Sequence, residues 1–313
     1  MIGVVRGYVA ATDYDWYRFL QARPELSEVN FWRPSGSPFR ALKPGELFFF
    51  KLKAPHNAVG GFGLFARTVV LSIWEAWEVF AAANGVADRP SLLERLSRLR
   101  GERLGRLAID DRITCIAINQ PVFFPPDEWV AAPADWQREI VQGKGYELTS
   151  GVGRSLLESC ADQAAKLRSA SDWTAEAVEA ARFGDPKIIR PRLGQSSFRI
   201  AVLEAYDQRC AVTGERSLPV IEATHIKPYA EGGEHAVING LPLRRDLHRL
   251  FDLGFVTVRP DLRFEVSRSL RERWQNGRIY YELSGREIRL PTHPQERPDR
   301  ELLSWHNDEV FRP

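Results

Sequence analysis

Apolar runs separated by polar turn signals mark the first half of the chain. Glu46–Leu52 (ELFFFKL) is a dense apolar run of strand length, preceded by the turn signal Lys-Pro-Gly at residues 43–45. The glycine-rich segment Gly60–Phe65 follows a short loop, so it is predicted to pair with that run as a hairpin. Ile113–Asn119 (ITCIAIN) is predicted to be another buried strand, ending at the following Gln-Pro pair.

Helical spacing appears between these strand candidates. Ser72–Ala83 carries apolar residues on one helical face and is followed by an Asn-Gly stop signal. Ser91–Arg100 is predicted to be a second, more charged helix. This mixture predicts an α+β fold, with the strands curling into a small barrel or sheet.

The second half of the chain is predicted to contain a helix, a break, and then a mixture of helices and strands. Ser155–Phe183 is rich in Ala and Glu and is predicted to be helical until the Gly-Asp-Pro break at residues 184–186. The elements expected beyond it are a helix at Ser197–Asp207, a strand-like stretch at Leu218–Ile226, a helix at Arg245–Asp252, and a hairpin of Phe255–Val258 with Arg263–Val266.

A length of 313 residues favours two domains. We expect one domain at residues 1–155, a helical linker at 156–190 and a second domain at 191–313. No apolar stretch approaches the roughly 20 residues of a membrane helix, so no membrane partner is expected. The N-terminal segment MIGVVRGYVA lacks the features of a secretory signal, and a cytoplasmic location is therefore expected.

The charge and the cysteines narrow the possible partners and metal sites only slightly. The net charge is +2, and from Asp185 onward 21 Lys and Arg face 19 Asp and Glu. All but two of those cations are Arg, whose forked head suits phosphate contacts. The three cysteines form no CxxC pair, which argues against a zinc ribbon and against a disulfide framework.

Chemistry-bearing residues gather late in the chain, where five of the six histidines lie beyond residue 224. His225 ends a strand-like segment, Asn239 sits in a loop, and His248 lies in a short helix with Asp252 one turn later. Two strands packed on that helix would bring His225 and His248 to face each other across a gap. Such a gap suits a metal ion and a phosphate, as phosphodiester hydrolysis requires.

These residues lie in segments that, in order, resemble the HNH endonucleases, and more narrowly the HNH domains of bacterial restriction-type nucleases. The resemblance covers Arg192–Val266 and rests on CAVTG (210–214), ATHIKP (223–228), GGEH (232–235), NGLPL (239–243) and LHRLFD (247–252). It implies a ββα-metal fold that hydrolyses DNA with one divalent ion, Mg²⁺ or another such as Mn²⁺.

The resemblance also implies residue roles. His225 matches the general base, Asn239 matches the residue that fixes the loop or helps hold the base and metal, and His248 matches a metal ligand. The family often has Asp or His before the first His, where this chain has Thr224, a poor ligand; Asp252 or water is expected to complete the metal shell. Cys210 matches the first Cys of a zinc pair in many relatives, but partner cysteines are missing, so no structural zinc is expected.

DNA contacts and oligomeric state are expectations of the same kind. The residues expected to contact phosphate are Arg192, Arg199, Arg244 and Arg245. His235 is expected either to shape its loop or to touch phosphate, and His293 and His306 are expected to be structural or surface residues. One active site cuts one strand, so double-strand cleavage would call for a homodimer or transient pairing.

The first half resembles, less specifically, the PUA-like group that includes EVE and SRA domains. The resemblance rests on NFWRP (30–34), LKPGE (42–46), the FFFKL strand and GGFG (60–63). It implies that a modified base is held in an aromatic pocket. The pocket candidates are Trp32, Phe31, Asn30, Tyr14, Asp13 and Trp16, although aromatics at such spacing are more often core residues.

The combined hypothesis is a modification-dependent restriction endonuclease acting on double-stranded DNA that carries 5-methylcytosine or 5-hydroxymethylcytosine. Two alternatives stay open. One is a non-specific or RNA-directed HNH nuclease, and the other is a non-catalytic DNA-binding protein with a dead nuclease fold.

Overall fold

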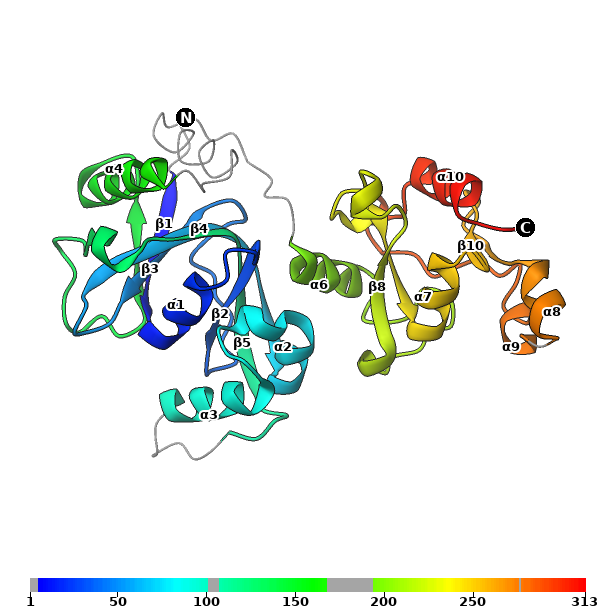
Figure 1. Ribbon diagram of the computed structural model, residues 1–313, viewed down its shortest axis with the longest axis horizontal. Helices are drawn as coiled ribbons and strands as arrows, with labels where there is room; N and C mark the ends of the chain where they lie inside the picture. Colours follow the sequence, from blue (N-terminus) through cyan, green and yellow to red (C-terminus); the bar gives the residue numbers. More distant parts are fainter. Residues whose placement is uncertain (1–4, 101–106, 168–193, 276) are drawn as a thin grey trace. The chain divides into compact units, whose positions relative to one another are not determined.

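The computed structural model describes residues 5–100, 107–167, 194–275 and 277–313. The chain divides into two compact units, Met1–Pro191 and Arg192–Pro313. Both units combine strands with helices (Figure 1), which confirms the predicted α+β class. Within the described ranges no helix has the length and apolar character needed to cross a membrane.

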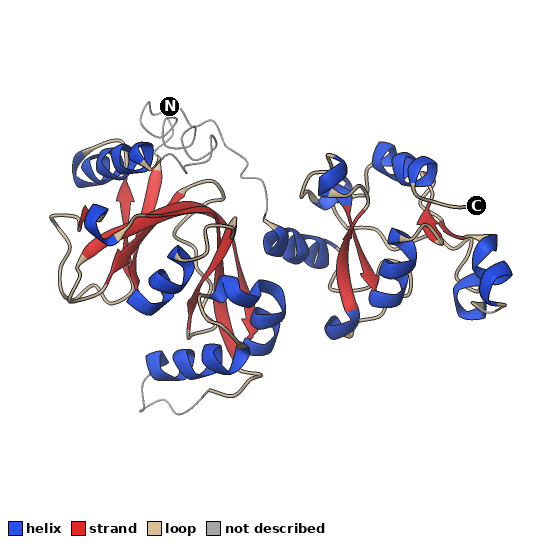
Figure 2. Ribbon diagram, viewed as in Figure 1, coloured by secondary structure: helices blue, strands red, loops and turns tan. Residues whose placement is uncertain are grey.

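The N-terminal unit is built on one mixed sheet, which curves strongly in Figure 2. Its order is β2-β5-β4-β3-β1-β7, with the short β6 paired to β4. The β1 and β3 strands are parallel, and the other pairs are antiparallel. The strands are β1 (Arg6–Thr12), β2 (Glu28–Arg33), β3 (Leu47–Leu52), β4 (Ala58–Ser72), β5 (Arg112–Phe123), β6 (Val130–Ala131) and β7 (Gly143–Glu147).

Helices cover both faces of this sheet. Successive side chains of β3 point to opposite faces and therefore pack against different helices. Phe50 meets Trp16 of α1 (Tyr14–Gln21) with ring centroids 5.2 Å apart. Its neighbour Phe49 lies in the core cluster that includes Leu157 of α4 (Gly151–Lys166). The other α-helices in the described part of this unit are α2 (Ile73–Phe80) and α3 (Arg89–Arg100).

The strand predicted at Ile113–Asn119 exists, but it continues through the Gln-Pro pair to Phe123. The two residues Gln120 and Pro121 lie opposite the single Gly63 of β4, where the register shifts as in a β-bulge. A Cβ at Gly63 would lie 2.5 Å from Ile118 Cγ2, so glycine is what allows this close approach. A bulge tolerates the proline that a regular ladder would exclude.

The start of the predicted linker packs into the N-terminal unit. Leu156, Leu157 and Cys160 of α4 are buried in the same core cluster as β3 and β4. The helix begins at Gly151 and ends at Lys166, earlier than the predicted end at Phe183. The rest of the predicted linker lies outside the described residues.

The C-terminal unit holds a ββα arrangement. The antiparallel pair β8 (Ile221–His225) and β9 (Gly240–Arg244) packs against α7 (Arg245–Asp252), which has the predicted bounds. Leu241 and Leu243 of β9 and Leu247 of α7 are fully buried in one core cluster. The preceding helix α6 (Gln195–Ala205) contributes Phe198 and Val202 to that cluster.

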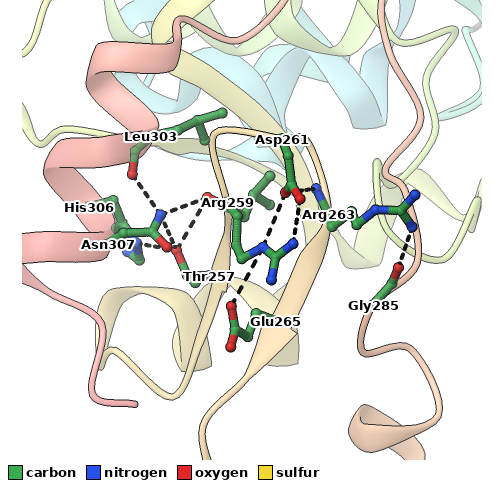
Figure 3. Close-up of polar contacts among 10 residues, drawn as sticks. Thr257, Arg259, Asp261, Arg263, Glu265, Gly285, Leu303, His306 and Asn307 are labelled. Carbon is green, nitrogen blue, oxygen red and sulfur yellow. Dashed lines mark hydrogen bonds and ion pairs between the residues drawn. The ribbon is translucent and has the colours of Figure 1, made fainter.

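The residues after this centre extend the same core. The predicted hairpin forms from β10 (Val256–Val258) and β11 (Phe264–Val266). The described α-helices that follow are α8 (Arg268–Trp274), α9 (Arg278–Tyr281) and α10 (Arg300–Glu309). Asn307 of α10 donates hydrogen bonds to Thr257 Oγ1 at 3.2 Å and Val258 O at 2.8 Å, which fastens α10 to β10 (Figure 3).

Candidate active site

The helix α7 presents a histidine and a carboxylate side by side. Leu247 and Phe251 face the core, while His248 and Asp252, four residues apart, share a partly exposed face. His248 Nε2 lies 3.4 Å from Asp252 Oδ2. The pair thus offers one imidazole nitrogen and one carboxylate oxygen from a single helical turn.

Glu222 of β8 completes this group and was not foreseen from the sequence. Its Oε2 lies 2.7 Å from His248 Nδ1, and its Oε1 accepts from Arg245 Nε at 2.9 Å. Burial alone would raise the pKa of Glu222, but the bond with His248 and the charge of Arg245 outweigh it and lower that pKa. A proton on His248 Nδ1 shared with this carboxylate leaves Nε2 with its lone pair free.

A signal for Glu222 did exist in the sequence. It stands two residues before Thr224, and residues two apart on a strand lie on the same face.

His225 is held at the end of β8 by ring contacts. It stacks on Phe198 of α6 with centroids 4.0 Å apart and planes 10° apart. Its Nε2 lies 2.8 Å from His235 Nδ1. Burial, with the nearby charges of His235 and His248, lowers the pKa of His225 to about 4. The ring is therefore neutral at pH 7, as a proton acceptor must be.

Asn239 ties together the loop between β8 and β9. Its Oδ1 accepts from Lys227 N at 2.9 Å, and its Nδ2 donates to Lys227 O at 2.9 Å and Glu234 O at 2.8 Å. The loop passes so close to itself that a Cβ at Gly233 would lie 1.9 Å from Lys227 O. With its oxygen already bonded and the residue buried, Asn239 acts here on the backbone.

The side chains around His248 determine whether a divalent ion can bind there. Thr224 is 1% exposed and its Oγ1 has no hydrogen-bond partner among the described residues. Burial raises the pKa of Asp252 and the charge of Glu222 adds to this, while His248 and Arg249 oppose it. The described ranges contain no group of three or more His, Cys, Asp or Glu placed to hold a metal. The two atoms offered by His248 and Asp252 fit an ion such as Mg²⁺, which usually keeps waters and takes substrate phosphate as further ligands.

The arginines predicted to contact phosphate already have partners within the unit. Arg244 bonds Asp246 through two nitrogens at 2.8 and 2.7 Å, and Arg245 bonds Glu222. Arg199 donates to Ile221 O at 3.4 Å. Arg192 lies outside the described residues. Phosphate contacts by Arg244 and Arg245 would use the guanidinium N–H groups that these bonds leave over.

The N-terminal unit contains a separate cavity of about 420 Å³. Four of the six residues predicted for a base pocket line it, namely Asp13, Trp16, Phe31 and Trp32. The sequence did not single out Tyr8, Phe39 and Phe48, which also line it, nor the polar Arg33, Lys53 and Gln142. Tyr8 and Phe39 had no signal of their own, because β1 and the loop after β2 were not predicted.

The other two predicted pocket residues do not line the cavity. Asn30 is fully buried, donates to Asn84 Oδ1 at 2.8 Å and accepts from Ile116 N at 3.0 Å. Tyr14 packs on His56 with ring centroids 4.3 Å apart. Trp32 bonds Asn84 O through its indole nitrogen at 2.8 Å, so what it can offer the cavity is its flat ring.

Comparison with solved structures found two kinds of similarity. The ASCH protein from Zymomonas mobilis is 13% identical, with 49% of this chain and 94% of that chain covered and a TM-score of 0.33. A structure named modification dependent TagI restriction endonuclease is 12% identical, with 91% of this chain and 76% of that chain covered and a TM-score of 0.30. No curated protein matched the sequence.

A family model described as HNH endonuclease matches residues 210–259. This range contains β8, the loop tied by Asn239, β9 and α7, with His225 and His248 on them. Residues 210–259 of this chain are therefore an HNH region, similar in sequence to HNH endonucleases.

Proposed function

We propose that this chain is a modification-dependent restriction endonuclease that hydrolyses double-stranded DNA carrying 5-methylcytosine or 5-hydroxymethylcytosine. The observation that carries the proposal is the position of His225 at the end of β8, in the same HNH region as the paired His248 and Asp252. An aromatic cavity in the N-terminal unit supports the dependence on a modified base.

The chemistry is divided among residues of the C-terminal unit. His225 takes a proton from the attacking water, whose oxygen then forms the new bond to phosphorus while the bond from phosphorus to the leaving oxygen breaks. His248 and Asp252 would hold a divalent ion, which when bound neutralises phosphate charge and stabilises the leaving oxygen. Glu222 orients His248, and Asn239 keeps the loop that follows His225 in place.

The cavity in the N-terminal unit suits a flat base turned out of the duplex. Stacking needs aromatic faces, which Phe31 and Trp32 supply, and reading a base edge needs polar groups, which Asp13 supplies. A single HNH centre cuts one strand, so we propose that cleavage of both strands requires two copies of the chain.

The test is cleavage of one plasmid in unmodified, cytosine-methylated and hydroxymethylated form, each with Mg²⁺ and with EDTA. The expected result is cutting of modified DNA only, and only with the metal. A His225→Ala variant controls for contaminating nuclease. Metal-dependent cutting of all three plasmids would remove the modified-base part of the proposal, and cutting by His225→Ala equal to wild type would remove the catalytic part.

A further inference from the structure

His225 and His235 form a bonded pair of imidazoles. His225 Nε2 and His235 Nδ1 are 2.8 Å apart, and the ring centroids are 4.8 Å apart. Each ring is backed by an aromatic neighbour, because Phe198 stacks on His225 and Tyr229 stacks on His235 with planes 7° apart. The backbone next to His235 is tied by Asn239, which bonds Glu234 O. The pair is therefore a fixed feature of the domain.

The direction of this hydrogen bond decides what His225 can do. A neutral imidazole has one N–H donor and one acceptor nitrogen. Since Nε2 of His225 is committed to His235, only Nδ1 is left to accept a proton from water. Nδ1 can accept only if the single ring proton is on Nε2, and then His235 Nδ1 must be the acceptor of the bond. The reverse direction would place the proton on Nδ1 of His225 and block the base.

We propose that His235 is a positioning residue, which accepts the hydrogen bond from His225 Nε2 and so keeps Nδ1 of His225 free to act as the base. The inference rests on the proposed role of His225 in hydrolysis. When Nδ1 takes the proton of water, an O–H bond breaks and an N–H bond forms. The Nε2–H of His225 then donates from a cationic ring, and this charge-assisted bond is stronger than the neutral one. Burial lowers the pKa of His235, which is consistent with a neutral acceptor at pH 7.

Two variants separate this role from a structural role. His235→Phe keeps a flat ring against Tyr229 but cannot accept a hydrogen bond. His235→Asn carries an oxygen as many bonds from the backbone as Nδ1, so it can accept. We expect His235→Phe to lower kcat on cleavable DNA by about 10² with little change in KM, and His235→Asn to recover most of that loss. A raised KM with unchanged kcat in His235→Phe would instead show a phosphate contact and overturn the proposal.

The tautomer itself can be observed without any cleavage. Ring ¹⁵N chemical shifts of the full-length, metal-free protein report which nitrogen of each histidine carries the proton, and His225 is identified by the signals missing from His225→Gln. The proposal expects the proton on Nε2 in wild type and in His235→Asn, and a loss of this preference in His235→Phe. A proton on Nδ1 in wild type overturns the proposal. If the expected tautomer is found but the protein cuts no DNA, the hydrogen-bond direction of the His225–His235 pair stands and the proposed function is refuted instead.

Discussion

At the scale of single residues, the site depends on side chains that orient other side chains. Both carboxylate oxygens of Glu222 are already hydrogen-bonded, one to His248 and the other to Arg245. Glu222 therefore acts by orienting His248 and not as a metal ligand. Partners of this kind fix the tautomer and direction of a metal-binding histidine. The histidines could be predicted from order and spacing, whereas the strand pattern gives only the face on which Glu222 lies, and its contact with His248 depends on how β8 packs against α7.

We predict that Glu222→Gln weakens metal binding. The change removes the negative charge that holds the proton on His248 Nδ1, and loss of such a partner typically costs 10- to 100-fold in affinity. Titration calorimetry with Mn²⁺ on the full chain measures it. Glu272→Gln, at an exposed position on α8, is the control for the loss of one charge. Equal affinities in the two variants would contradict the orienting role of Glu222.

A second prediction separates two roles of Asn239, which are fixing the loop and helping to hold the metal. Only the first role affects stability when no metal is bound. Asn239→Ala removes three hydrogen bonds and leaves backbone groups of Lys227 and Glu234 without partners. We expect it to lower the free energy of unfolding of the C-terminal unit by about 3 kcal/mol, as measured by urea unfolding in EDTA. A metal ligand without a structural role would leave stability in EDTA unchanged.

At the scale of elements, prediction succeeded where local pattern and final packing agree. The helix Arg245–Asp252 has the predicted bounds because Leu247 and Phe251 recur at helical spacing and enter the core. The strand β5 was predicted too short because its bulge needs Gly63 of another strand, which no local window contains. Likewise β1 was missed, because its alternation is weak and its place in the sheet comes from pairing with β3 and β7.

The helix α10 also shows tertiary context overriding local polarity. His306 was expected to be a structural or surface residue, and it is structural: it is 2% exposed, its ring centroid lies 3.6 Å from that of Phe251, and its Nδ1 lies 2.8 Å from Thr257 Oγ1. Figure 3 shows His306 and Asn307 of α10 meeting Thr257. Burial lowers the pKa of His306 from 6.5 to about 4, slightly opposed by its bond to Phe251 O.

We predict from this shift that acid destabilises the C-terminal unit. The unfolded chain binds a proton at His306 near pH 6.5, whereas the folded chain does so only near pH 4. The contribution of His306 to the free energy of unfolding is therefore fully present above about pH 6.5. It falls by about 3 kcal/mol as the pH drops toward 4. His306→Gln, which keeps polar atoms but does not titrate, should lose that part of the pH dependence. Since His225 contributes in both proteins, the difference between urea unfolding of wild type and variant isolates His306.

At the scale of the whole molecule, the chain has two units with separate cores, and the proposed function assigns a different task to each. The core cluster that includes β3, β4 and α4 shares no residue with the cluster around β9 and α7. The aromatic cavity lies in the first unit and the HNH domain in the second. Changes to the cavity should therefore alter which DNA is bound without altering the chemistry of cutting.

The cavity gives the last prediction. Phe31 is half-buried, lines the cavity and contacts Trp16 and Phe48. If a base stacks there, Phe31→Ala removes an interaction worth about 1–3 kcal/mol, so the affinity for modified over unmodified duplexes should fall by about tenfold or more. Binding of Mn²⁺ to the HNH domain should stay the same, because that domain has its own core.

Phe19 offers a matched control for this experiment. It is a half-buried phenylalanine on α1 that lies outside the cavity, where Arg23 stacks on its ring. Phe19→Ala should leave the preference for modified DNA intact, while Phe31→Ala removes most of it, as measured by fluorescence anisotropy on labelled duplexes in EDTA. An unchanged preference in Phe31→Ala would place base recognition outside this cavity. A preference absent from wild type would favour a nuclease whose N-terminal unit does not read modification.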